Sequence, residues 1–447
     1  MTHTFTSPLK KTVTLLLAFA LQPWSGGWLS AQQAPHLTID EAADRAANSS
    51  TPVQLAELDR QLAAADYRQT DAVLLPQLQL GYQAVVTNNP LNAFGFLLQQ
   101  EGVTQQAFDP SRLNSPGAAH NIGTTVEARV PLLNLDLLYA RKGARLQQEV
   151  RGHQLAYTRQ HIAFATRKAY TQLQFAYALR HILSTTLDDV KQIHRSVSNF
   201  RDQGLVQQSD VLNAQVQVNT VESALAKAQS NIANASEALA MLMGQGTGQQ
   251  TIFTVDSLSQ VPPMPSGSEL PASRPDLMAM KTAITASKTM EKSAFMAMMP
   301  KVNAFGSYQL NDTRMLGFGH DSYMAGLSLS WNIFSGNRNT AKLKAARIAT
   351  AKVQKQLDEL VDNSRLEIAK ARRDLSDRQT EIDKQQASVQ QATEALRITN
   401  NRYHEGLANT TDVLTAQAQL SQQRMALAQA VMEYNITTYY LRLLTTE

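Results

Sequence analysis

A cluster of six methionines is the feature of this sequence that most resembles a metal-binding site. They gather just ahead of a predicted strand, at Met278, Met280, Met290, Met296, Met298 and Met299. Thioether sulfur is a soft ligand that suits Cu(I), so the cluster could handle copper. Methionine on a helix that leads into a strand more often fills irregular gaps in a core. We therefore interpret the cluster as packing and predict no metal site.

The other patterns that could support catalysis or cofactor binding lack their structural context. The run Gly244-Gln-Gly246-Thr-Gly248 has the look of a phosphate-binding loop, but it follows a predicted helix rather than a strand. The nine histidines are scattered, without a pair at the spacing of zinc ligands on a helix. Neither a nucleophile elbow nor a zinc motif is present. The sequence therefore predicts no enzyme and no cofactor.

Two aspartates, Asp210 and Asp412, stand at matched positions near the start of two predicted helices. With Ser209 and Thr411 as N-caps, each aspartate would take the first helical position. The helix dipole favours a negative charge there by up to about 1 kcal/mol. This structural role is favoured for Asp210. For Asp412 it is one of two alternatives, and the second follows from a family resemblance described below.

The chain that positions these residues contains the same pattern twice. The segment Phe200 to Gln215 is echoed by Arg402 to Gln417, and Leu75 to Gln83 is echoed by Met299 to Gln309. The elements follow in the same order in both halves, which is the signature of an internal repeat. Between the halves lies a stretch rich in Gly, Pro and Ser that predicts a connector.

The N-terminus has the three parts of an export signal. Lys10 and Lys11 precede the apolar run Val13 to Leu21, and Leu29-Ser30-Ala31 offers a small-residue cleavage site. The run is shorter than the roughly 20 residues that span a membrane, so we expect cleavage near Ala31. The predicted organisation is a signal peptide (1–31), a first repeat (32–243), a linker (244–272) and a second repeat (273–447).

Each half contains two segments in which apolar and polar residues alternate with a period of two. One face is apolar, with Leu78, Leu80 and Tyr82, then Val126, Ala128, Val130 and Leu132, then Val302, Ala304, Tyr308 and Leu310, then Tyr323, Ala325, Leu327, Leu329, Trp331 and Ile333. The other face carries mainly Gln, Ser, Thr and Asn. Such strands form either a one-sided soluble sheet or barrel strands that are apolar toward lipid and polar toward water. Four strands cannot close a barrel, so the second case requires a dimer with eight strands or a trimer with twelve.

The rest of the sequence predicts long helices. Thr38 to Glu41 is a capping box that opens a helix to about Asp71. Two helices, from about Tyr139 to Arg201 and from about Asn339 to Tyr403, would each be roughly 95 Å long. Gly204 and Gly406 close them as left-handed caps, and a return helix of about half that length follows each. Heptad apolar residues predict a coiled-coil seam on the return helices, at Val218, Val221, Leu225, Ala228, Ile232, Ala235, Leu239 and Leu242, and at Leu420, Leu427, Ala430, Tyr434 and Leu441.

The overall composition fits long helices rather than compact globules. Aromatic residues make up only 6%, and the formal charge of +4 on 447 residues is too weak to predict a nucleic-acid partner. The chain has no cysteine, which excludes disulfides, thiolate metal sites and a lipidated N-terminal cysteine.

With its duplicated halves, paired strands and matched Gly-Leu…Asp-Val-Leu…Ala-Gln turns at Gly204 and Gly406, the sequence resembles the TolC-like outer-membrane efflux protein family. The resemblance covers nearly all of the mature chain. It implies a mixed α/β membrane protein, mainly α: a homotrimer whose twelve strands form one β-barrel that continues into an α-helical coiled-coil tunnel. Such a protein would sit in the outer membrane of a Gram-negative-type bacterium, in contact with outer-membrane lipid, and extend into the periplasm.

The resemblance also implies a function and partners. The chain would be the passive exit duct of a tripartite efflux or type I secretion system. A periplasmic adaptor would dock at the tips Gly204, Leu205, Gly406 and Leu407, and would couple the duct to an inner-membrane transporter of the RND, ABC or MFS type.

In this family the second return helix usually begins with acidic residues that narrow the pore. Asp412 matches the first of these positions, and Thr415 stands where a second acid often sits. Asp210 and Tyr403 match the partners of a latch that holds the closed tip, but Ala408 replaces the basic residue of that latch. The resemblance therefore implies one acidic ring and leaves the latch in doubt.

A different class of protein, a secreted trimeric coiled-coil fibre or adhesin, would also contain heptads. A fibre does not need matched strand pairs inserted between its helices, so the sequence favours the channel.

Overall fold

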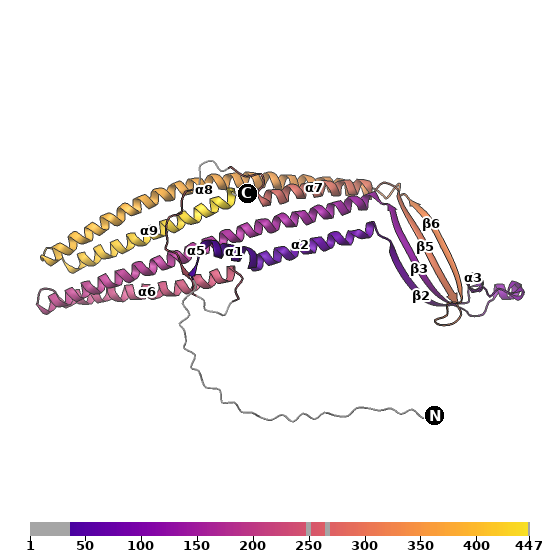
Figure 1. Ribbon diagram of the computed structural model, residues 1–447, viewed down its shortest axis with the longest axis horizontal. Helices are drawn as coiled ribbons and strands as arrows, with labels where there is room; N and C mark the ends of the chain where they lie inside the picture. The colour runs from indigo at the N-terminus through magenta and orange to yellow at the C-terminus, as the bar shows by residue number, and fades with distance from the viewer. Residues whose placement is uncertain (1–35, 247–251, 264–268, 446–447) are drawn as a thin grey trace, which may run out of the picture.

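The computed structural model describes residues 36–246, 252–263 and 269–445. The predicted signal peptide, 1–31, lies outside the described residues. Figure 1 shows an elongated molecule with a helical rod at one end and a sheet at the other. In chain order the elements are β1 (His36–Leu37), α1 (Ile39–Ser49), α2 (Thr51–Gln69), η1 (Thr70–Val73), β2 (Gln77–Thr87), α3 (Pro90–Gln99), η2 (Gln105–Phe108), α4 (Pro110–Asn114), β3 (Ala119–Leu133), α5 (Leu135–Asp202), α6 (Gln208–Leu242), β4 (Thr254–Val255), α7 (Pro275–Met296), β5 (Lys301–Asp312), β6 (His320–Ser330), α8 (Arg338–His404) and α9 (Thr410–Thr445).

The two long helices form the backbone of the rod, as predicted. Helix α5 has 68 residues and α8 has 67, so each is about 100 Å long. Helices α6 and α2 run beside α5, one beyond the other, while α9 and α7 run beside α8 in the same way (Figure 1). Two short helices thus stack end to end along each long helix. Helix α5 also contacts α7 and α9, which joins the two halves into one layer.

The predicted heptad seams lie inside this layer. Val218, Val221 and Ala228 of α6 are buried with Leu183 and Val190 of α5. In the second half, Ala430 and Tyr434 of α9 pack against Ile382 of α8. Small and β-branched side chains at these contacts let the long helices approach closely. None of the helices in the described residues has an apolar run sufficient to cross a membrane.

The first helix is interrupted where the sequence analysis expected one continuous helix from Thr38 to about Asp71. The capping box is confirmed, with Glu41 N donating to Thr38 Oγ1 and Thr38 N donating to Glu41 Oε2. Helix α1 ends at Ser49, and α2 starts anew at Thr51 because Ser50 takes an extended conformation. Pro52 lies in the first turn of α2 and has no N–H to continue the α1 ladder, which accounts for the break.

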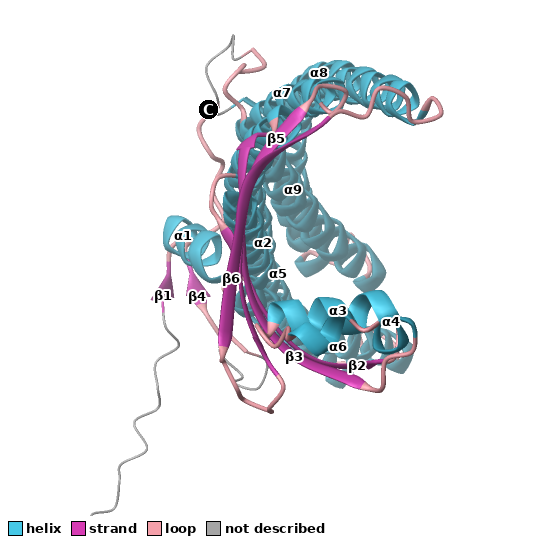
Figure 2. Ribbon diagram, turned by 90° about the vertical axis from the view of Figure 1, so that its right-hand side faces the viewer, coloured by secondary structure: helices cyan, strands magenta, loops and turns pink. Residues whose placement is uncertain are grey.

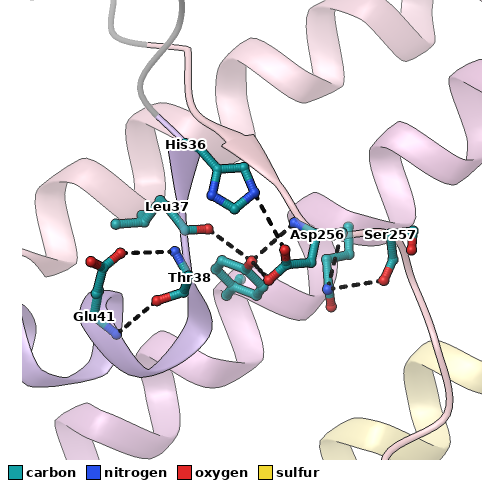
Figure 3. A network of polar contacts seen from close by, with 8 residues as sticks. His36, Leu37, Thr38, Glu41, Asp256 and Ser257 are labelled. Atoms are coloured by element: carbon teal, nitrogen blue, oxygen red, sulfur yellow. Dashed lines mark hydrogen bonds and ion pairs between the residues drawn. The ribbon is translucent and has the colours of Figure 1, made fainter.

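A short parallel strand pair in the middle of the rod was not predicted. His36 and Leu37 of β1 pair with Thr254 and Val255 of β4. The buried Tyr170 hydroxyl lies 2.9 Å from Leu37 O and 3.1 Å from Asp256 Oδ2, so it holds both strands against α5. Figure 3 shows Leu37 and Asp256 side by side at this point. Burial raises the pKa of Tyr170 to about 12, because the buried site disfavours the charged phenolate.

The four predicted strands form one antiparallel sheet in the order β2-β3-β5-β6. Their register places Leu80, Val126, Tyr308 and Tyr323 in one row across the sheet. A bulge shifts the register between Pro131 and Leu133, so Leu133 rather than Leu132 pairs with Val302. Figure 2 shows that the sheet is strongly curved.

Candidate functional site

The two turns at the far end of the rod have the geometry that the sequence predicted for them. Gly204 and Gly406 have φ values of +75° and +74°. Leu205 N donates to Phe200 O, and Leu407 N donates to Arg402 O, which satisfies the last carbonyls of α5 and α8. A Cβ at either glycine would meet no atom within 4 Å. The constraint on these positions is therefore the backbone angle rather than space.

Asp210 and Asp412 cap their helices, but not in the predicted way. The expectation that Ser209 and Thr411 are the N-caps is wrong. The N-cap of α6 is Gln207, whose N–H donates to Asp210 Oδ2 at 3.1 Å. At α9, Asn409 N donates to Asp412 Oδ2, and Asp412 N donates to Asn409 Oδ1, both at 2.9 Å. Each aspartate is thus the third helical residue, the N3 position of a capping box, which satisfies main-chain donors that are otherwise unpaired.

Asp412 and Thr415 lie one turn apart on the exposed side of α9. Val413 and Gln417 of the same helix are buried. Both side chains are therefore exposed in one chain, although one carboxylate oxygen of Asp412 accepts the hydrogen bond from Asn409 N.

The latch residues Asp210 and Tyr403 are not brought together within one chain. Asp210 is engaged by Gln207, whereas Tyr403 is 6% exposed and belongs to a tip core with Val197 and Val413. Its ring packs edge-on against Phe200, with ring centroids 5.5 Å apart. Tyr403 therefore joins the α5–α6 tip to the α8–α9 tip.

A buried polar contact between α5 and α9 was missed from the sequence. Gln417 is 2% exposed and donates from Nε2 to Asp189 Oδ2 at 2.9 Å. Its counterpart in the first repeat, Gln215, is exposed. The difference arises because α9 lies between α5 and α8, whereas α6 lies at the edge of the layer. The repeated sequence alone did not distinguish these two surroundings.

At the opposite end of the rod the sheet has one apolar and one polar face. In the row across the sheet, Leu80 and Tyr323 are 72% and 84% exposed, although both are large and apolar. The other face carries Gln77, Gln79, Gln309 and the ion pair Glu127–Arg129, whose nearest atoms are 2.7 Å apart. A sheet that exposes apolar side chains on one face and polar side chains on the other suits an interface between lipid and water.

Among the described residues, no strand pairs with the outer edge of β2 or of β6. An open edge leaves backbone N–H and C=O groups without partners, which lipid does not tolerate.

Two of the methionines and one arginine near the sheet make specific contacts. Met290 packs closely over Gly143 of α5, and Met298 O accepts a hydrogen bond from Trp331 Nε1 at 3.0 Å. In the described residues, no group of three His, Cys, Asp or Glu side chains is placed to hold a metal ion. Arg141 pairs with Asp71 at 2.6 Å and lies over the Tyr67 ring.

Comparison with known families agrees with this geometry. The sequence pattern of the family described as outer membrane efflux protein matches residues 42–245 and 267–446. The chain belongs to this family. It is an outer-membrane exit duct, located in the outer membrane of a Gram-negative bacterium and extending across the periplasm. Outer membrane efflux proteins are channel and transport proteins, so membership in this family selects the channel hypothesis rather than the secreted fibre.

The chain is similar to characterised outer membrane efflux proteins along most of its length. The multidrug resistance outer membrane protein MdtP of Escherichia coli O6:H1 is 23% identical over 422 residues, which cover 90% of this chain and 83% of MdtP. The cation efflux system protein CusC of Escherichia coli K12 is 28% identical over 279 residues, 58% of each chain. A crystal structure of a membrane protein from Pseudomonas aeruginosa superposes with a TM-score of 0.79 at 20% identity, covering 91% of this chain and 93% of that one. The fold is therefore the TolC-like, mainly helical fold.

Proposed function

We propose that three copies of this chain form one continuous duct, with a twelve-stranded barrel in the outer membrane and a helical tunnel below it. The observation that supports this most directly is the pair of open sheet edges, because β6 of one copy can pair with β2 of the next. Closing the sheet in this way would leave no unpaired edge in lipid.

The helical layer has open edges that match those of the sheet. Helix α2 presents Leu55, Leu58 and Leu62 on one exposed face, at the spacing of a coiled-coil seam. Helix α8, at the other edge of the layer, exposes Ile348, Leu366 and Ile398. Contact between α2 and α6 of one copy and α8 of the next would bury both sets.

Three copies fit the concave side of the sheet better than two. An eight-stranded barrel is about wide enough for its own side chains and little more. The loop between β2 and β3 folds into α3, η2 and α4; this loop lies beyond the ends of the strands (Figure 1), and in the view along the long axis α3 and α4 project over the concave side of the sheet (Figure 2). An eight-stranded barrel would therefore leave little width for cargo, whereas a twelve-stranded barrel is wider.

The purified protein should therefore have the mass of three chains in detergent. Leu62→Lys should lower the temperature at which the trimer dissociates, because it places three charges in the proposed seam. Gln61→Lys, on the neighbouring exposed face of α2, should leave that temperature unchanged. A monomer or a dimer, measured by light scattering with correction for detergent, would contradict the proposal.

The tips are proposed as the docking surface for a periplasmic adaptor, with Gly204, Leu205, Gly406 and Leu407 at the contact. Leu205 and Leu407 are exposed large apolar side chains at the ends of the two turns. Their position at the far end of the rod from the sheet would bring them near an inner-membrane transporter of the RND, ABC or MFS type.

The names of MdtP and CusC refer to multidrug resistance and to cation efflux. The polar face of this sheet is amide-rich and its Glu127–Arg129 pair is neutral overall, so we assign cargo selection to the transporter.

The loop from about Asn88 to His120 and the loop from about Asp312 to Asp321 should face the outside of the cell. A cysteine at the exposed Ser115 should then react with a membrane-impermeant maleimide on intact cells, since the chain has no native cysteine to interfere. A cysteine at Ser209, in the opposite tip, serves as the control and should react only after the outer membrane is broken. The reverse pattern would invert the proposed topology.

A further inference from the structure

The loop between β2 and β3 is fastened to the polar face of the sheet by a buried amide chain. Gln100, at the C-terminal end of α3, is 8% exposed and donates from Nε2 to His120 O at 2.8 Å and to Asn121 Oδ1 at 2.9 Å. Asn121 donates in turn to Asn311 Oδ1 at 3.0 Å. Asn121 and Asn311 are both buried and belong to the polar face of β3 and β5. The end of α3 is therefore held at the rim of the sheet, on its polar face.

Helix α3 presents an apolar face away from this anchor. Ala93 is 3% exposed and lies on the buried side together with Gln100, whereas Leu91 and Leu98 are 81% and 56% exposed. Because Leu91 and Leu98 are seven residues apart, they share one face of the helix. Phe94 packs against Phe108 of η2, with ring centroids 5.7 Å apart, which steadies the helix from the side.

Helix α3 is also free of charge. The sequence contains no Asp, Glu, Lys or Arg between Asp71 and Glu101. Around a symmetry axis, every charge on a contact face meets its own copies, so an uncharged apolar face suits a contact between identical chains. Leu91 and Leu98 would otherwise face the water of the lumen without a partner.

We propose that the α3 helices of three copies meet around the barrel axis and form an apolar gate at the outer mouth of the duct. In this gate the exposed face of each α3 helix is covered by the same face of α3 from a second copy of the chain. This inference rests on the proposed trimer. It adds a second closure, at the end of the duct opposite to the helical tips, whose opening requires Leu91 and Leu98 of the three copies to separate.

Single cysteines test the contact cleanly because the chain has none of its own. In outer membranes treated with copper phenanthroline, Leu91→Cys should form disulfide-linked dimers. At most about two chains in three can be linked, because the third cysteine of a trimer has no partner. Asn92→Cys, the next exposed residue but on another face of α3, should give at least about tenfold less dimer. Adding Gln100→Ala to Leu91→Cys should also reduce the dimer, because the anchor is lost.

The gating role has a separate readout. A cysteine at Gln79, exposed on the polar face of β2, should react slowly with a bulky membrane-impermeant maleimide added to intact cells. Replacing Leu91 and Leu98 with aspartate should speed that reaction about tenfold or more, because three like-charged copies would repel one another. Slow labelling that is relieved in this way supports the gate.

The failures of the two proposals are distinguishable in the same preparation. An intact trimer without Leu91→Cys dimers, or with equal dimer from Asn92→Cys, overturns the gate and leaves the duct. An intact trimer in which Gln79→Cys labels at the same rate in both backgrounds also overturns the gate. A protein without trimers overturns both proposals.

Discussion

Replacing Gly406 with valine should abolish export while trimers remain in the outer membrane. Gly406 has a φ of +74°, a conformation that costs an L-residue roughly 1–2 kcal/mol and a β-branched residue more. Relief of that strain would change the turn between α8 and α9 and move Leu407, which we propose at the adaptor contact. The barrel and most of the tunnel lie far from the turn and should be unaffected.

The matched control is Gly406→Asn, because asparagine adopts the left-handed conformation more readily than other residues with a side chain. No atom lies within 4 Å of the position of a Cβ at this glycine, so the added side chain should fit. Export would be measured as drug or ion tolerance of cells that have this chain as their sole duct, and trimers by unheated gel electrophoresis. Normal tolerance with Gly406→Val would show that the turn is not the contact.

Replacing Asp412 with asparagine should lower the cation selectivity of the channel in bilayer recordings, with no loss of trimer. Three copies of Asp412 around an axis would place three negative charges in one narrow throat. Asparagine keeps an oxygen that can accept the hydrogen bond from Asn409 N, so most of the capping box should survive. If Asp412 acts only as a cap, selectivity should stay unchanged and stability should fall by up to about 1 kcal/mol per subunit.

Two further variants separate the ring from the cap. Asp210→Asn removes the charge from the equivalent capping position of α6, where Asp210 accepts a hydrogen bond from Gln207 N. It should leave selectivity unchanged, because the family resemblance places only the α9 aspartate in the throat. Thr415→Asp adds a second acidic ring one turn farther along α9 and should raise cation selectivity. Equal effects of Asp210→Asn and Asp412→Asn on selectivity would remove Asp412 from its special position in the pore.

The main architecture could be predicted from the sequence because it depends on patterns that extend over many residues. Alternation over four strands and heptads over the two return helices each average out local exceptions. The break at Ser50 depends on the single residue Pro52, within a segment that otherwise favours helix. Similarly, either Gln207 or Ser209 could begin α6, and the choice depends on which one pairs with Asp210.

The candidate site could be predicted only in part, because a repeated sequence does not reveal its neighbours. Gln215 and Gln417 occupy equivalent positions, yet only Gln417 is buried, since only α9 has a long helix on each side. By resemblance Tyr403 matched a latch position, and within one chain it packs on Phe200 of the other tip. The strands β1 and β4 were missed because two residues are too few to show alternation.

The pairing of β1 with β4 orders the steps by which the chain can fold after export. His36 and Leu37 leave the secretion machinery early, but their partners Thr254 and Val255 follow about two hundred residues later. Closing so long a loop costs conformational entropy, but this cost rises only slowly with loop length. Pairing of β1 with β4 is therefore possible but slow. Because β4 precedes α7, the first repeat can close before the second has emerged, and a chain stalled short of β4 would leave β1 unpaired.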